Sequence, residues 1–118
     1  MFGGLAHEQA ITLARRLAAL LPGDLAHVFF SDSGSVAVEV AMKMAVQYWI
    51  NRGVRARHQF VACKGGYHGD TTGAMAVSDT EDGMHARFAG LLPQHHIVDL
   101  PDSEERAVAL DKFLGTRA

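Results

Sequence analysis

Hydrophobic and polar residues alternate along the chain with periods that predict a series of helices and short strands. Between residues 7 and 21 apolar side chains recur every three or four positions, which predicts an amphipathic helix. Pro22 and Gly23 follow and are typical of a helix end. The apolar run at residues 27–30 then predicts a short buried strand.

The centre of the sequence predicts a strand, a helix and a second strand. Residues 36–50 contain neither glycine nor proline and are rich in helix formers, so they predict a long helix after the polar turn at 31–35. Residues 59–63 predict the next strand. Two strands that flank a helix are expected to be parallel, so the segment predicts a βαβ unit.

The rest of the chain predicts a loop, shorter elements and a final helix. Residues 64–73 form a glycine-rich loop, and residues 74–78 predict a short helix. Residues 79–93 are expected to be irregular, and residues 96–100 predict a third strand. The polar residues 102–105 open a last helix that ends at Gly115.

Composition places the 118 residues within one domain of α/β class. Hydrophobic residues make up 48% and charged residues 20%, values typical of a globular protein. The net charge of −2 has no long run of either sign, so neither nucleic acid nor a membrane surface is an expected partner. No membrane span is expected, and a single cysteine, Cys63, favours a cytoplasmic location. The first four residues lead almost directly into a helix, which favours an internal part of a larger domain.

The turn before the long helix is the first candidate site. The segment Ser33-Gly34-Ser35 stands where unpaired backbone N–H groups and the helix dipole favour an anion. Gly34 permits close backbone approach, and the serine hydroxyls are additional donors. The alternative is that a serine only caps the helix, which is the commoner role of serine at this position.

The glycine-rich loop holds the second candidate, Tyr67, after the second strand. Ligands of open α/β sheets lie at the carboxyl ends of strands, and an aromatic ring there can stack on a flat ligand. Tyr67 could equally pack over the edge of the sheet. His68 is interpreted as structural. His95 and His96 would point in opposite directions on a strand, with no cluster to complete a site, so no metal is expected.

Two motifs resemble the class III aminotransferases, which depend on pyridoxal phosphate (PLP). They are residues 29–45 (FFSDSGSVAVEVAMKMA) and residues 66–75 (GYHGDTTGAM), and they occur in the order that the family shows. Val36, residues 47–49 and residues 69–71 narrow the resemblance to a branch of the family that serves biotin biosynthesis. That branch transfers an amino group from S-adenosylmethionine to 8-amino-7-oxononanoate. Residues 2–7 and 84–85 agree with it, and the resemblance fades beyond residue 93.

The resemblance implies roles for individual residues. Gly34 and Ser35 match the pair that binds the PLP phosphate, and Tyr67 matches the aromatic residue stacked on the pyridine ring. Asp70 matches a residue near the substrate pocket, while Gly3 and Gly4 match a segment near the dimer interface and the active site. The family also implies a homodimer, small-molecule substrates and the fold-type I architecture, a mainly parallel sheet with flanking helices. Residues 1–118 would form part of its PLP-binding large domain, with no second domain.

Several groups that the family needs have no match in this chain. The lysine that holds the cofactor covalently and the acidic partner of the pyridine nitrogen lie further along the chain in the family. Lys43, Lys64 and Lys112 do not stand in the family's lysine motif, so no catalytic residue is assigned. The chain is therefore expected to bind the cofactor at most and to be inactive alone. Two alternatives stay open: another class III aminotransferase acting on an ω-amino acid or diamine, and a non-catalytic module that binds a phosphate ligand or a protein.

Overall fold

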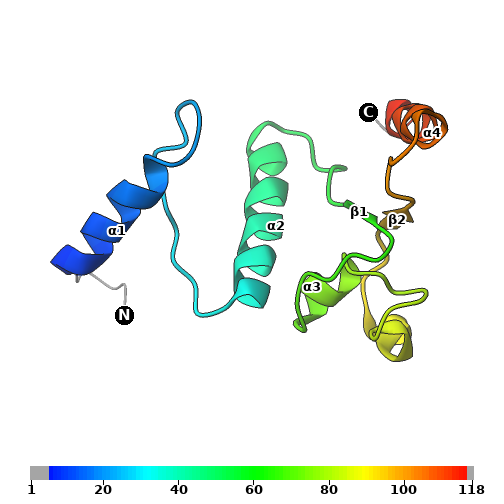
Figure 1. Cartoon of the computed structure of the whole chain (residues 1–118), viewed down its shortest axis with the longest axis horizontal. Coiled ribbons are helices and arrows are strands. Elements are labelled where there is room, and N and C mark those ends of the chain that lie inside the picture. Colours follow the sequence, from blue (N-terminus) through cyan, green and yellow to red (C-terminus); the bar gives the residue numbers. More distant parts are fainter. Residues whose placement is uncertain (1–5, 117–118) are drawn as a thin grey trace. The chain divides into compact units, whose positions relative to one another are not determined.

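The computed structural model describes residues 6–116, which divide into two compact units, residues 6–30 and residues 31–116 (Figure 1). The first unit contains helix α1 (Glu8–Ala18). Its N-cap is His7, whose Nδ1 accepts a hydrogen bond of 3.3 Å from the Ala10 N–H. The predicted helix over residues 7–21 is confirmed, although it ends three residues earlier.

The strand predicted at residues 27–30 is wrong. These residues are irregular, and their backbone forms no sheet hydrogen bond with any residue that the structure describes. Phe29 is 68% exposed. An apolar run becomes a strand only when a neighbouring strand satisfies its N–H and C=O groups, and no such neighbour is present among residues 6–116.

The second unit is built on helix α2 (Gly34–Asn51) and a two-stranded parallel sheet of β1 (Val61–Cys63) and β2 (His96–Val98). The long helix is confirmed and begins two residues earlier than predicted. Val61 pairs with His96 and Cys63 with Val98. The two strands lie within the segments predicted for them and are parallel. The predicted βαβ unit is wrong in its pair of strands. The parallel partner of β1 is β2, which follows it in the chain, and residues 27–30 before α2 form no strand.

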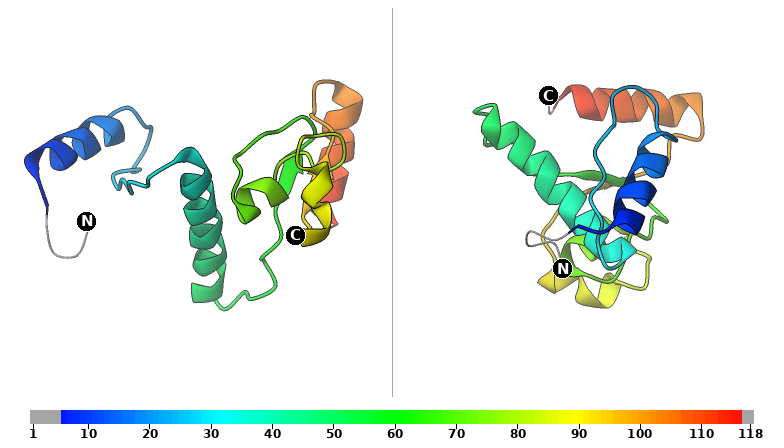
Figure 2. Two further views of the ribbon diagram at one scale, coloured as in Figure 1. Left: turned by 90° about the horizontal axis from the view of Figure 1, so that it is seen from below. Right: turned by 90° about the vertical axis from the view of Figure 1, so that its left-hand side faces the viewer.

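Shorter elements connect the strands. Helix α3 (Thr72–Ala76) begins two residues before the predicted short helix and packs on the first turns of α2 (Figures 1 and 2). A 3-10 helix, η1 (Ala86–Leu91), lies within the segment expected to be irregular. Helix α4 (Glu104–Gly115) ends the unit, and the Ser103 hydroxyl caps it by accepting the Arg106 N–H. None of the described helices is long and apolar enough to cross a membrane.

Apart from Gly69 in the glycine-rich loop, the buried residues of the described chain all lie between residues 74 and 92, in α3 and the segment after it. They are Ala74, Ala76, Val77, Ser78, Asp79, His85 and Leu92. Three of these seven are polar, so this small core depends on hydrogen bonding as well as on apolar contact. Two of its polar members, Ser78 and Asp79, form hydrogen bonds with the glycine-rich loop and so hold that loop in place.

Candidate functional site

The first turn of α2 carries both a helix cap and free donors. The Ser33 hydroxyl accepts a hydrogen bond of 3.2 Å from the Val36 N–H, so Ser33 is the N-cap. The Gly34 and Ser35 N–H groups donate to no residue in the described part of the chain. A methyl group added at Gly34 would meet no other atom within 4 Å, so the surface beside the Gly34 Cα is open. The turn thus has a serine cap and, separately, the donors of an anion site.

Ser35 links this turn to the glycine-rich loop. Its hydroxyl oxygen accepts a hydrogen bond of 3.1 Å from the Asp70 N–H, and its carbonyl lies 3.5 Å from the Thr71 hydroxyl. The hydroxyl proton of Ser35 remains available for a ligand. Gly69 has a φ of 131° and passes so close to Ser35 that a side chain at position 69 would overlap it. The contact therefore requires glycine at this point.

Tyr67 lies in the same loop with its ring largely accessible. Its hydroxyl donates a 2.8 Å hydrogen bond to Asp70 Oδ2. This bond, with some burial and the negative charge of Asp70, raises the pKa of Tyr67 above its ordinary value. The ring stacks on His85 with centroids 5.6 Å apart and planes 21° apart, yet the residue is 57% exposed. A flat ligand therefore has room to stack on Tyr67.

His85 is a member of the site that the sequence did not single out by its chemistry. Only 4% of the residue is exposed, and its Nε2 lies 3.7 Å from Asp70 Oδ1. The two Asp70 oxygens therefore face two aromatic partners, Tyr67 and His85. The only signal in the sequence was the agreement of residues 84–85 with the family, which carried no role.

Asp79 holds the start of the glycine-rich loop by hydrogen bonds with Gly65 and Gly66. Its carboxylate accepts hydrogen bonds from the N–H groups of Gly65 (2.7 Å), Glu81 (3.0 Å) and Asp82 (3.1 Å), and these bonds hold its pKa below the ordinary value. Its own N–H donates to the Gly66 carbonyl at 2.8 Å. His68 is held nearby through its N–H, which donates to the Ser78 hydroxyl at 3.0 Å.

Glu39 fastens the other side of the loop to α2. Its Oε1 accepts a 2.6 Å hydrogen bond from the Gly73 N–H. Burial raises the pKa of this carboxyl, but hydrogen bonds from Gly73, Thr71 and Ala74 and the charge of Lys43 outweigh burial and bring it below the ordinary value. Glu39 and Lys43 are four residues apart, a spacing typical of a surface ion pair on a helix, so the local pattern does not indicate the contact of Glu39 with the loop.

The remaining candidates lie in other contacts. Lys64 pairs with Glu81 and Asp99, each at 3.6 Å, and these carboxylates, Asp99 first, raise its pKa. Gly3 and Gly4 lie outside the described residues.

The two adjacent histidines at the start of β2, His95 and His96, face different partners. The ring of His95 meets Phe60, whereas His96 meets Phe113 and lies 3.0 Å from Gln59 Oε1. Burial, together with His96 and His58, lowers the pKa of His95.

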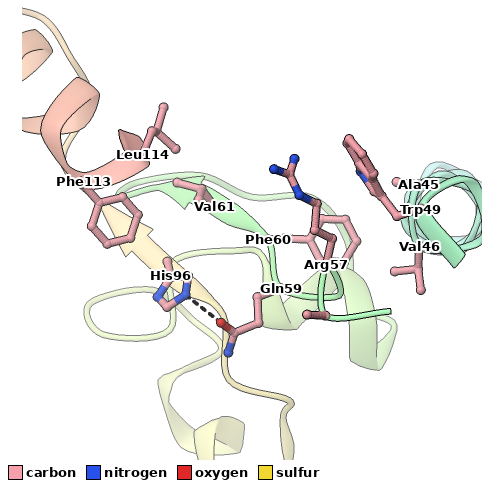
Figure 3. Close-up of a pocket in the computed structure, with 11 residues that line it drawn as sticks. Ala45, Val46, Trp49, Arg57, Gln59, Phe60, Val61, His96, Phe113 and Leu114 are labelled. Atoms are coloured by element: carbon pink, nitrogen blue, oxygen red, sulfur yellow. Dashed lines mark hydrogen bonds between the residues drawn. The ribbon is translucent and has the colours of Figure 1, made fainter. Parts of the chain in front are cut away.

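An apolar groove of about 650 Å³ lies elsewhere in the second unit (Figure 3). Trp49 of α2, Phe60, Val61 and Phe113 of α4 line it, and Arg57 lies over the Trp49 ring at 4.2 Å. None of the predicted site residues contributes to its wall. The groove is therefore separate from the donors at the start of α2.

The arrangement can hold an anion joined to a flat ring. The free N–H groups at Gly34 and Ser35, the positive end of α2 and the Ser35 hydroxyl suit a phosphate. Tyr67 supplies a ring face, and the Asp70 carboxylate orients its hydroxyl. The residues present therefore fit the phosphate and pyridine ring of PLP.

Comparison with known proteins gives a consistent result. The family model described as "Aminotransferase class-III" matches residues 1–113. The adenosylmethionine-8-amino-7-oxononanoate aminotransferase of Buchnera aphidicola (subsp. Acyrthosiphon pisum) is 50% identical over 103 residues, 87% of this chain and 24% of the relative. The protein of the same name from Mycobacterium leprae is 51% identical over 92 residues, 78% of this chain and 21% of the relative. The chain thus spans about a quarter or less of the curated relatives it matches.

Solved structures agree. The crystal structure of adenosylmethionine-8-amino-7-oxononanoate aminotransferase from Methanocaldococcus jannaschii superposes with a TM-score of 0.84 at 37% identity, covering 96% of this chain and 26% of that chain. A PLP-bound amine transaminase from an uncultivated Pseudomonas species gives a TM-score of 0.72 at 37% identity, covering 86% and 23%. The predicted α/β fold of PLP-dependent aminotransferases is confirmed.

Proposed function

Because the chain belongs to the class III aminotransferase family, we propose that residues 1–118 form part of a PLP-binding large domain. Gly34 and Ser35 bind the cofactor phosphate, and Tyr67 stacks on its ring. The observation that carries the proposal is the pair of free N–H groups at the start of α2, next to the Ser35 hydroxyl.

Each residue has a separate task in this proposal. The N–H groups of Gly34 and Ser35 and the α2 dipole neutralise the phosphate charge, and the Ser35 hydroxyl donates one further hydrogen bond. Tyr67 limits the tilt of the ring, while Asp70 fixes the Tyr67 hydroxyl and borders the substrate. Bound PLP supplies an electron sink for moving an amino group. No residue of this chain is proposed as catalytic.

For the whole protein we propose transfer of an amino group from S-adenosylmethionine to 8-amino-7-oxononanoate, giving 7,8-diaminononanoate. The names of relatives at 50% and 51% identity support this substrate pair. We further propose a cytoplasmic homodimer. A second candidate, an amine transaminase reaction, is supported by the 37% identity to a PLP-bound amine transaminase structure.

The phosphate contact is tested by PLP titration of the protein expressed from its full reading frame, with absorbance or protein fluorescence as the signal. Ser35→Ala removes a hydrogen bond to a charged group, which contributes about 1.5–3 kcal/mol, so the PLP dissociation constant is expected to rise roughly 10- to 100-fold. Ser103→Ala is the matched control, since it removes a serine from the start of α4 instead. Equal PLP affinity in the Ser35→Ala and wild-type proteins would contradict the assignment.

The reaction is tested with purified protein and 8-amino-7-oxononanoate as acceptor. We expect product with S-adenosylmethionine and none with alanine or an ω-amino acid as donor. Product with alanine or an ω-amino acid alone would establish the second candidate in its place.

A further inference from the structure

The environment of His85 is unusual for a residue whose only role is packing. The residue is 4% exposed, and its Nε2 has no hydrogen-bond partner among the described residues. A buried polar atom without a partner costs about 1–3 kcal/mol, a cost that a phenylalanine or leucine would avoid. A compensating interaction is therefore expected at this nitrogen.

The group that Nε2 faces is the Asp70 carboxylate. The distance from Nε2 to Asp70 Oδ1 is 3.7 Å, which is within reach of an ion pair and longer than a hydrogen bond. A shift of about half an ångström by either side chain would close it to a hydrogen bond. Asp70 Oδ2 is already occupied by the Tyr67 hydroxyl at 2.8 Å, so Oδ1 is the oxygen left for His85.

The same imidazole also supports the ring of Tyr67. The two planes lie 21° apart with centroids at 5.6 Å, and the stack is formed by the buried ring beneath the exposed one. Hydrogen bonds hold the backbone on both sides of His85. The Asp79 carboxylate accepts the N–H groups of Glu81 and Asp82 before it, and the His85 carbonyl accepts the Phe88 N–H at 2.9 Å. The buried imidazole of His85 therefore contacts both members of the Tyr67–Asp70 pair.

We propose that His85 is a positioning residue of the PLP site: its ring face holds Tyr67, and its Nε2 holds the Asp70 carboxylate. The inference rests on the proposed function. Because the Asp70 N–H also donates to the Ser35 hydroxyl at 3.1 Å, His85 connects the residue that stacks on the cofactor ring with the residue that binds its phosphate. His85 acts through these neighbours and takes no part in bond making.

Two substitutions separate the two contacts. His85→Phe keeps a flat ring beneath Tyr67 and removes the nitrogen, whereas His85→Gln keeps a donor near the Nε2 position and removes the ring. His58→Ala is the control, since His58 is an exposed histidine outside the site. All proteins are expressed from the full reading frame. The measurements are the PLP dissociation constant, the circular dichroism of bound PLP, and kcat and KM for the amino acceptor.

Each variant is expected to change a different measurement, PLP binding for His85→Gln and the acceptor KM for His85→Phe. His85→Gln should weaken PLP binding about two- to tenfold and alter its circular dichroism, while the acceptor KM stays within about twofold of wild type. His85→Phe should bind PLP within about twofold of wild type and raise the acceptor KM about two- to tenfold with little change in kcat. The His58→Ala protein should match wild type in every measurement.

Any result in which the two variants fail to separate in this way overturns the inference, including equal losses that follow a lower melting temperature. A wild-type protein that does not bind PLP refutes the proposed function, and the inference falls with it. Wild-type PLP binding combined with unchanged His85→Phe and His85→Gln proteins refutes the inference alone.

Discussion

Gly69 is where the glycine-rich loop passes the start of α2, and its replacement by alanine is the sharpest test of the site's architecture. The residue has a φ of 131°, a region that side chains other than glycine rarely adopt. The added methyl carbon would also lie 2.7 Å from Ser35 Cβ and 2.8 Å from Ser35 Cα, and still closer to the Ser35 hydroxyl oxygen. Backbone strain and steric overlap therefore act together.

The two effects can be added approximately. A residue forced into a sparsely populated backbone region costs about 1–3 kcal/mol, and overpacking a close contact costs a further amount of about 1–3 kcal/mol. Gly69→Ala is therefore expected to lower the free energy of unfolding by about 2–6 kcal/mol. The loop must move to relieve the overlap, so the Asp70–Ser35 hydrogen bond should break and PLP binding should weaken as well.

Two other glycines separate the contributions. Gly53 has a φ of 80° and open space around its Cα, so Gly53→Ala should cost only about 1–3 kcal/mol of backbone strain. Gly90 has neither a positive φ nor a close neighbour, so Gly90→Ala should raise the free energy of unfolding by about 0.4–1 kcal/mol.

Urea unfolding followed by circular dichroism measures all three substitutions in the protein made from its full reading frame. PLP titration of the same samples reports on the site. If Gly69→Ala unfolds at the same urea concentration as Gly53→Ala and binds PLP normally, the close passage of the loop over Ser35 is refuted.

Three ionisable residues give further predictions. Glu39→Gln should lower the free energy of unfolding by about 1 kcal/mol at pH 7, because the charged acceptor of the Gly73 N–H becomes neutral. The lowered pKa of Glu39 stabilises the wild-type fold above pH 4.5, and this contribution should fade as the pH falls below 4.5. The Glu39→Gln protein should lack that part of the pH dependence. Asp79→Asn should lower the urea midpoint at pH 7, and because the pKa of Asp79 is lowered, the difference from wild type should shrink as the pH falls below 3.8. The lowered pKa of His95 means that protonation of this residue favours the unfolded chain. The stabilising contribution of neutral His95 should therefore be fully present above pH 6.5 and be lost as the pH falls below 6.5. In urea midpoints measured from pH 7.5 to pH 5, His95→Gln should reduce that loss.

Elements with strong local signals could be predicted from the sequence. The helix at Gly34–Asn51 has an unbroken run of helix formers and a serine cap, and both are local properties. The strand at residues 27–30 has an equally apolar sequence but lacks a pairing partner among the described residues, and no local pattern reports on pairing. The same reason explains why the parallel partner of β1 was assigned wrongly.

The candidate site divides in the same way. The donors at Gly34 and Ser35 and the ring of Tyr67 were predicted, since the turn and the glycine-rich loop carry recognisable motifs. Glu39 was missed because its contact with Gly73 spans 34 residues and is set by the packing of α3 on α2. His85 was missed because its burial, the property that distinguishes it from the other histidines, appears only in the folded chain.

The cap of α2 and the free donors beside it use different backbone groups, with Ser33 serving Val36 and the Gly34 and Ser35 N–H groups left over. A ligand therefore has no cap to displace and finds the helix already formed. Binding of a ligand to these donors should therefore raise the free energy of unfolding. Above the dissociation constant, this increase should grow with the logarithm of the ligand concentration. Inorganic phosphate at high concentration should raise the melting temperature by the same route and compete with PLP.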